Sequence, residues 1–229
     1  MSLIYLPCIA GPLSSAANVH DPYFSNVVLL CHCETGFTNV VQPLGRGAIL
    51  SLGSTQTISA TNPRYGTGCL DCVGTGTYGA SSSSDYILGT GNLTVEFSAR
   101  TGSPSQTAIL LDWRSGDPQI CPTLYMQGGA YYYYVNGANR LGPLGTVSTN
   151  VYDVIGYSRV GTTGYLAQNG TVLGSWTDTN NYVNDLIHIG ANYVNAGQFT
   201  GKIDEIRVTK GAGRFSANYA IATGPFSDS

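Results

Sequence analysis

Hydrophobic and polar residues alternate in short runs along the chain, each about as long as one β-strand. The run Leu93–Arg100 places Leu93, Val95 and Phe97 on one face and polar residues on the other. This alternation predicts a strand with one buried and one wetter face. Gly, Ser, Thr and Asn separate such runs about every 8–12 residues, a spacing typical of a β-sandwich or barrel.

Two Asn-Gly pairs, Asn136-Gly137 and Asn169-Gly170, lie between β-rich runs. Both central residues of a type I′ turn need positive φ, which Asn tolerates and Gly adopts freely. The pairs therefore predict two tight hairpins. The hairpins join Tyr131–Val135 to Ala138–Leu141 and Tyr165–Gln168 to Thr171–Trp176.

The same reading gives the rest of the secondary structure, and no segment has a helical stripe. Further strands are predicted at Asn26–Cys33, Leu93–Arg100, Ala108–Trp113, Thr123–Gln127, Val151–Val160, Asp185–Ile189 and Gly201–Lys210. Gly79–Ser84 and Gly102–Gln106 are predicted to be loops. Residues 1–20 carry prolines and no strand pattern, so they are predicted to form an extended N-terminal arm before a single domain, residues 21–229.

Charge is scarce and excludes several classes of protein. Asp, Glu, Lys and Arg make up 10% of the chain, the formal net charge is −3, and a typical soluble protein has about 25% charged residues. Without a basic stripe we expect no nucleic-acid partner. No apolar run reaches about 18 residues, so we expect no membrane insertion. Residues 1–17 match a signal peptide poorly, because no positive charge precedes the apolar stretch and Pro7 interrupts it.

Several segments carry a resemblance to a known family. They are Asp21–Glu34, Cys69–Gly76, Ser84–Phe97 and Gly201–Gly211, the last followed by Arg214–Tyr219 and Pro225-Phe226. These segments resemble the concanavalin A-like (laminin G-like) jelly-roll domains common in structural proteins of tailed phages, and the resemblance covers about residues 20–228. The chain departs from the family pattern at Val73, where an Asp is usual, and at Cys33 and Cys72.

The resemblance implies an all-β fold, a two-sheet antiparallel jelly-roll sandwich. It also implies a non-enzymatic structural protein on the exterior of a tailed-phage virion, in a head decoration, a collar, or the tail or its fibres, made in the host cytoplasm. The partners would then be other virion proteins and further copies of this chain, with weak glycan binding to a host-surface polysaccharide. The alternatives are a free carbohydrate-binding (lectin-like) module and a glycoside hydrolase.

Hydrolysis of a glycoside needs two carboxyl groups that face each other across the scissile bond. On a strand such a pair is commonly supplied by acidic residues two or four positions apart, which share a face. Glu34, Glu96 and Glu205 have no acidic residue at those distances, and Asp204 is adjacent to Glu205, on the opposite face. The sequence therefore predicts that the protein is not an enzyme.

The run Tyr131–Tyr134 is the most unusual in the chain. In an alternating strand two of its tyrosines pack inward, while Tyr132 and Tyr134 decorate the other face of the sheet. Aromatic rings there can stabilise the sheet or contact sugar rings. The candidate glycan-binding residues are Trp113, Arg114, Tyr132, Tyr134 and Trp176.

Asp204 is the one candidate for a metal ligand. Strict alternation places it on the apolar face with Ile206 and Val208. There it could coordinate Ca²⁺, which takes several oxygen ligands, or accept hydrogen bonds from backbone N–H groups, which we favour. Glu205 and Arg207 are predicted to form a solvated pair. No cofactor is otherwise expected.

The six cysteines are Cys8, Cys31, Cys33, Cys69, Cys72 and Cys121. A zinc site is disfavoured because Cys31 and Cys33 lie within an apolar strand, with His32 on its other face. A disulfide from either of these two cysteines to Cys69 or Cys72 stays open. The interpretation we favour is a set of small buried hydrophobic residues, reduced in a cytoplasm.

Overall fold

The computed structural model describes residues 20–75 and 79–229. The predicted N-terminal arm up to residue 19, Cys8 and the signal-peptide question lie outside the described residues. These residues form strands and three short 3₁₀ turns. The turns are η1 (Phe24–Asn26), η2 (Gln42–Leu44) and η3 (Ser84–Tyr86). None of the helices in the described segments has the length and apolarity to cross a membrane.

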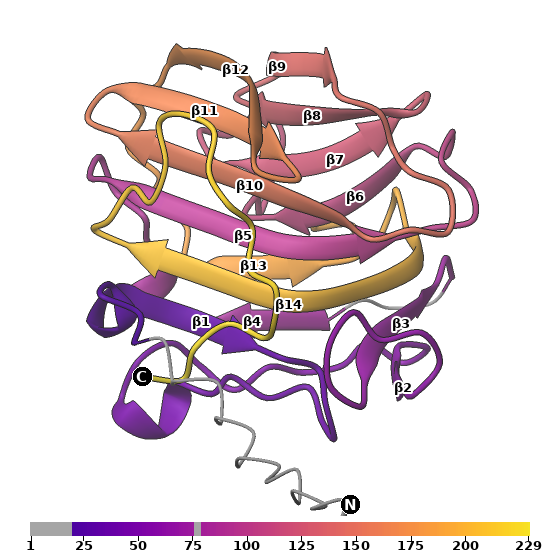
Figure 1. Cartoon of the computed structure of the whole chain (residues 1–229). Coiled ribbons are helices and arrows are strands. Elements are labelled where there is room, and N and C mark those ends of the chain that lie inside the picture. Colours follow the sequence, from indigo (N-terminus) through magenta and orange to yellow (C-terminus); the bar gives the residue numbers. More distant parts are fainter. Residues whose placement is uncertain (1–19, 76–78) are drawn as a thin grey trace, which may run out of the picture.

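Two sheets face each other (Figure 1). The front sheet runs β12-β11-β10-β5-β14-β3-β2, and β1 also pairs with β14. Its strands are β1 (Val27–Cys31), β2 (Thr57–Ser59), β3 (Cys69–Val73), β5 (Leu93–Arg100), β10 (Asp153–Val160), β11 (Thr163–Gln168), β12 (Thr171–Thr177) and β14 (Thr200–Lys210).

The back sheet runs β4-β13-β6-β7-β8-β9. Its strands are β4 (Gly79–Ser82), β6 (Ala108–Asp112), β7 (Thr123–Gln127), β8 (Ala130–Val135), β9 (Ala138–Leu144) and β13 (Leu186–Ile189). The ladders between named strands are antiparallel. The prediction of an all-β, two-sheet antiparallel jelly-roll sandwich is confirmed.

Both Asn-Gly hairpins are confirmed. Asn136 and Gly137 have φ of 51° and 75°, and Asn169 and Gly170 have φ of 50° and 79°. The predicted loop at Gly79–Ser84 is wrong in its first part, because Gly79–Ser82 forms β4 and pairs with β13. Its small polar residues suit a short strand at the edge of a sheet.

Strand β14 connects three strands of the front sheet. One side pairs with β5, and the other pairs first with β3 and then with β1. On the β5 side, Asp204 lies opposite Ser98 and Arg207 lies opposite Glu96, so the two residues between them oppose one residue of β5. This β-bulge carries Glu205 at φ 53°. An extra residue in a strand reverses the faces of the residues that follow it.

The core between the sheets contains a polar network as well as aliphatic residues. The rings of Tyr133 and Tyr157 stack with centroids 3.7 Å apart. The hydroxyls of Tyr157 and Tyr182 donate to Asp178 at 2.7 and 2.8 Å. The guanidinium of Arg159, which is 0% exposed, lies 3.4 Å from Asp178.

Arg159 also connects two loops. It donates to the carbonyl oxygens of Gly91, Asn180 and Gly89 at 2.7–2.8 Å. A buried charge is tolerated only when it is paired and its donors are satisfied, and here Asp178 and the three carbonyl groups meet that need. The network therefore fixes the loops that precede β5 and follow β12.

Residues 211–229 cross the outer face of the front sheet (Figure 1, yellow). Arg214 N donates to the hydroxyl of Thr94, and Phe215 N donates to that of Ser158. A Cβ at Gly156 would lie 2.9 Å from atoms of Phe215 and Tyr219, so glycine is required for this close contact. The prediction of one wetter face for Leu93–Arg100 is wrong, because this segment buries Thr94, Glu96 and Ser98.

The covered face holds paired charges. Arg207 lies 2.6 Å from Glu96 and 3.2 Å from Asp21, and Arg214 lies 2.7 Å from Asp21. Burial alone would raise the pKa of Asp21, but the hydrogen bonds from Arg214 and from the Tyr23 N–H hold it below its usual value. The predicted solvated pair of Glu205 and Arg207 is wrong, since Glu205 is buried and pairs instead with a histidine.

That histidine is His32, which fastens the C-terminus to the sheet. Its Nδ1 lies 2.9 Å from Glu205 Oε1, and its Nε2 lies 2.7 Å from Asp228 Oδ1. Burial alone would lower the pKa of His32, but the two carboxylates outweigh burial and raise it to about 9. His32 is therefore charged at neutral pH and links β1, β14 and the end of the chain.

The five described cysteines are free and buried. The sulfur atoms of Cys31 and Cys33 lie 3.4 Å apart, and burial raises the pKa of the Cys72 thiol to about 12. The described residues form no disulfide between these strands and no cluster of three metal-ligating side chains.

Replacing Arg159 tests the buried network. We expect Arg159→Met to lower the free energy of unfolding by about 3–5 kcal/mol, because Asp178 would remain as an unpaired buried charge. The control Lys202→Met breaks a pair in which Asp71 is 32% exposed, and should cost about 0–1 kcal/mol. Urea unfolding measures both; similar costs for the two variants would contradict the role given to Arg159.

Replacing His32 tests the C-terminal link. Because its pKa is raised in the folded state, the stabilisation is complete below about pH 6.5 and disappears as pH rises through about 9. We expect His32→Gln to lower Tm by about 5 °C at pH 6, and by much less at pH 10. His20→Gln, at an exposed position, is the control. A deficit that is the same at both pH values would argue against the charged link.

Candidate functional site

The outer face of the back sheet presents two rows of side chains that run across its strands. The alternation of β7 and β8 sends Tyr125, Tyr132 and Tyr134 outward, where each is half-buried. The first row, in register, is His188, Asp112, Thr123, Tyr134 and Asn139. The second row is Ile109, Tyr125 and Tyr132.

Tyr125 and Tyr132 form a stacked pair with ring centroids 4.7 Å apart and planes 13° apart. Gly142 of β9 lies against the ring of Tyr132, because a Cβ there would fall 2.4 Å from Cδ1 of that ring. Following the strand order, Tyr132 therefore lies between Tyr125 and Gly142. The Tyr125 hydroxyl donates to Asn139 at 2.8 Å, so the second row is fixed by both stacking and a hydrogen bond.

Arg114 follows β6 and organises the neighbouring part of the face. Its Nε and Nη2 donate to the two carboxylate oxygens of Asp112 at 2.8 and 3.1 Å. Its Nη1 lies 3.5 Å from Asp117. Its guanidinium lies 5.0 Å from the ring centre of Tyr134 and 5.5 Å from that of Tyr193, within cation–π range.

Asp112 lies beneath the surface and holds the Arg114 side chain in place. It is fully buried and also accepts a hydrogen bond of 2.7 Å from the Thr123 hydroxyl. His188 Nδ1 lies 3.2 Å from the backbone oxygen of Asp112, and burial lowers the pKa of His188. Tyr134 donates to Asp117 at 2.7 Å.

These residues form what we term the tyrosine face. It consists of Tyr125, Tyr132, Tyr134 and Tyr193 with Arg114, Asp112 and Asp117. The face offers half-exposed rings and hydroxyl groups, but both carboxylates are paired with Arg114. Such a surface can form hydrogen bonds and apolar contacts, and it provides no free carboxyl pair for acid–base catalysis.

The structure brings three of the five predicted glycan-binding residues together: Arg114, Tyr132 and Tyr134. Trp113 points the opposite way and is 1% exposed in the core, so its ring offers a glycan no surface there. Trp176 lies on β12 of the front sheet, where its indole donates to the Tyr157 hydroxyl at 3.0 Å.

Four members of the face were missed from the sequence: Tyr125, Asp112, Asp117 and Tyr193. Tyr125 was within reach of prediction, because the register of the hairpin places it beside Tyr132. Tyr193 and Asp117 lie in loops without strand periodicity. No local pattern could bring these two loop residues to the face.

Asp204 lies elsewhere, on the covered outer face of the front sheet. The predicted placement with Ile206 and Val208 is wrong, because the bulge at Glu205 reverses the faces between them. Asp204 accepts hydrogen bonds from the N–H groups of Arg64 and Glu205 at 2.8 and 2.9 Å. Burial raises its pKa to about 7 despite these bonds. The described residues place no set of metal-ligating side chains around it.

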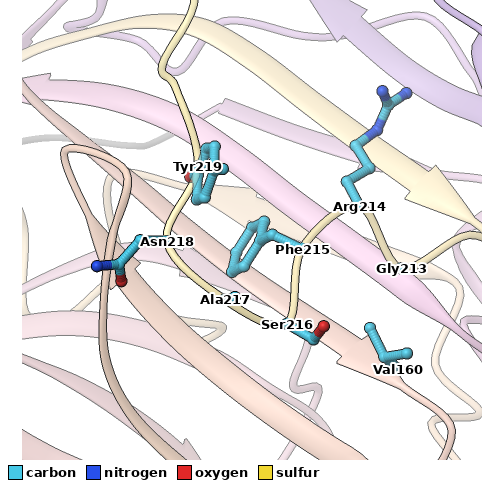
Figure 2. A pocket seen from close by; sticks show the side chains of 8 residues that line it. All are labelled: Val160, Gly213, Arg214, Phe215, Ser216, Ala217, Asn218 and Tyr219. Carbon is cyan, nitrogen blue, oxygen red and sulfur yellow. The ribbon is translucent and has the colours of Figure 1, made fainter.

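A shallow hollow of about 260 Å³ lies between the C-terminal segment and the end of β10 (Figure 2). The stacked rings of Phe215 and Tyr219, 4.5 Å apart, form part of its wall. Its one charged lining residue, Arg214, is paired with Asp21. The hollow therefore lacks both carboxyl groups and free charges.

Comparisons with known proteins show what the fold is similar to. No protein-family model matches the sequence, and no curated protein matches it. Among solved structures, domain 4 of AbnA, a GH43 extracellular arabinanase from Geobacillus stearothermophilus, in complex with arabinotriose, has a TM-score of 0.65 at 13% identity. That match covers 82% of this chain and 94% of the domain.

Two binding domains of botulinum neurotoxins are also similar. The serotype D domain has a TM-score of 0.62 at 12% identity, over 83% of this chain and 49% of that chain. The neurotoxin DC domain, solved in complex with SialylT, has a TM-score of 0.61 at 8% identity, over 82% and 48%. This chain thus spans about half the length of these toxin domains. At such identities the likeness shows the fold alone.

Proposed function

We propose that the protein is a non-enzymatic, lectin-like binding module that holds a polysaccharide on the tyrosine face. The observation that carries this proposal is the difference between the two outer faces. The front sheet is covered by residues 211–229, whereas the back sheet presents the half-buried Tyr125, Tyr132 and Tyr134 on its outer face. Ordered aromatic and polar side chains on an uncovered face are typical of a recognition surface.

The chemistry of the tyrosine face suits a sugar chain. Tyrosine rings supply contact area with little loss of side-chain entropy, and their hydroxyls can accept hydrogen bonds from a ligand. Asn139 adds an exposed amide next to Tyr125. A shallow site of this kind binds weakly as a single copy, and several copies would multiply its affinity.

The solved structures give independent support of a general kind. One similar domain was solved with arabinotriose and another with SialylT. Those ligands belong to those two proteins alone. The support for this chain is that its fold recurs in binding domains.

We further infer that the module acts on the exterior of a tailed-phage virion, in a head decoration, collar, tail or fibre. The support is the resemblance of Gly201–Gly211 and its flanking segments to phage structural domains. In this proposal the chain is made in the host cytoplasm, assembles with other virion proteins and further copies of itself, and contacts host-surface polysaccharide. A free lectin-like module is the alternative.

Substitution of the outward tyrosines tests the binding proposal. A glycan array of neutral and acidic polysaccharides is screened, and the affinity for each hit is measured by calorimetry. We expect Tyr132→Ala and Tyr134→Ala each to weaken binding about tenfold, a loss of about 1.4 kcal/mol.

Tyr165→Ala is the matched control. Tyr165 is also half-buried but lies on β11, opposite Ser158, on the outer face of the front sheet. Its loss should leave binding unchanged. An array without hits, or equal losses in all three variants, would refute binding at the tyrosine face.

Purified particles test the virion proposal. We expect mass spectrometry of phage particles from the source of this sequence to detect the chain at a fixed copy number relative to the capsid protein. Electron cryomicroscopy should then place it on the exterior with the symmetry of its attachment site. Detection only as a free protein in the lysate would favour the alternative of a free lectin-like module.

A further inference from the structure

We propose that the tyrosine face selects neutral over acidic glycans, and that Asp117 is the residue that excludes the acidic ones. This inference rests on the proposed function and adds the class of ligand.

Arg114 is the cation of the tyrosine face, and each of its three nitrogens already lies beside a carboxylate. Asp112 takes Nε and Nη2 in the paired geometry that arginine uses for carboxylates. Asp117 lies beside the remaining nitrogen, Nη1. An acidic sugar would have to displace one of these carboxylates to form an ion pair with Arg114.

Two aromatic rings also lie close to the guanidinium. The rings of Tyr134 and Tyr193 both lie within cation–π distance of it, and Arg114 is only 6% exposed. A ligand therefore meets the two rings rather than the cation. Arg114 acts as a support that holds the tyrosines in place.

The charge that does reach solvent is negative. The tyrosine face contains one guanidinium, that of Arg114, and two carboxylates, those of Asp112 and Asp117. It therefore carries an excess of one negative charge. Asp112 is fully buried, whereas the Asp117 side chain is 39% exposed. Both lysines of the chain, Lys202 and Lys210, lie on β14 in the other sheet, and the Arg140 guanidinium of β9 lies 5.6 Å from the ring centre of Trp176 on β12, so these cations do not offset this charge. An approaching carboxylate or sulfate would be repelled by Asp117.

A neutral sugar is not repelled by Asp117. The Tyr134 hydroxyl donates to Asp117 and the Tyr125 hydroxyl donates to Asn139, so both oxygens keep lone pairs for sugar hydroxyls. Hydroxyl groups of a sugar can also donate to the exposed part of Asp117. The same carboxylate therefore favours hydroxylated ligands and disfavours anionic ones.

The test compares three variants on matched ligands. Wild type, Asp117→Asn and Tyr132→Ala are measured at about 0.15 M salt against neutral and acidic glycan sets. The sets include hexagalacturonate and its full methyl ester, which share a backbone and differ in charge. Asp71→Asn is the control, because it changes the net charge of the chain equally but lies on β3 of the front sheet.

We expect wild type to bind neutral glycans at least about tenfold more tightly than any acidic one. Asp117→Asn should bind acidic glycans about fivefold more tightly than wild type does, so that the ratio of neutral to acidic affinity falls by at least about fivefold. Asp71→Asn should behave as wild type.

Each contrary result has a distinct meaning. Tight binding of an acidic glycan that Tyr132→Ala abolishes would overturn the selectivity and leave the proposed function standing. Failure of Asp117→Asn to gain acidic binding, or an equal gain in Asp71→Asn, would overturn the role of Asp117. Absence of any glycan binding that depends on Tyr132 would refute the proposed function, and this inference with it.

Discussion

Strand β14 pairs with β5, β3 and β1, and the C-terminal segment crosses its outer face, where Asp204 is buried and Arg207 is half-buried. A charge buried there without a partner would cost several kcal/mol, so Arg207 must meet Glu96 and Asp21. Arg207 and Asp21 lie 186 residues apart in the sequence. This pairing holds Asp21 and the C-terminal segment on the front sheet, and in the described part of the molecule it is the back sheet whose outer face is open to a ligand.

The bulge in β14 is the local feature on which that arrangement depends. With strict alternation, Arg207 would point into the apolar core and Ile206 would point outward. The extra residue at Glu205 instead sends Ile206 into the core and Arg207 toward Glu96. It also aims Glu205 at His32. One inserted residue thus serves both the apolar interior and the charged exterior of the same strand.

The features that can be predicted from the sequence are those that depend on residues close together in the chain. The Asn-Gly hairpins, the bounds of β5 and β7, and the alternation of Tyr131–Tyr134 all follow from local patterns. The covering of the front sheet does not follow from local patterns. Thr94 is buried by Ala212 and Arg214, which lie more than a hundred residues away in the sequence. The bulge was missed because alternation assumes an unbroken ladder. Asp117 and Tyr193 were missed because loops bring them to the face.

The fold by itself does not assign a function, since similar sandwiches occur in an arabinanase domain and in neurotoxin binding domains. The argument for binding rests on preorganisation. Asp112 is buried and holds Arg114, and Arg114 in turn fixes Tyr134 and Tyr193. Side chains that are fixed before a ligand arrives lose little entropy when it binds. A shallow surface can therefore bind a sugar chain without a deep cleft, provided that the charged side chains that hold its rings are paired inside the protein. Arg114 is paired in this way with the buried Asp112.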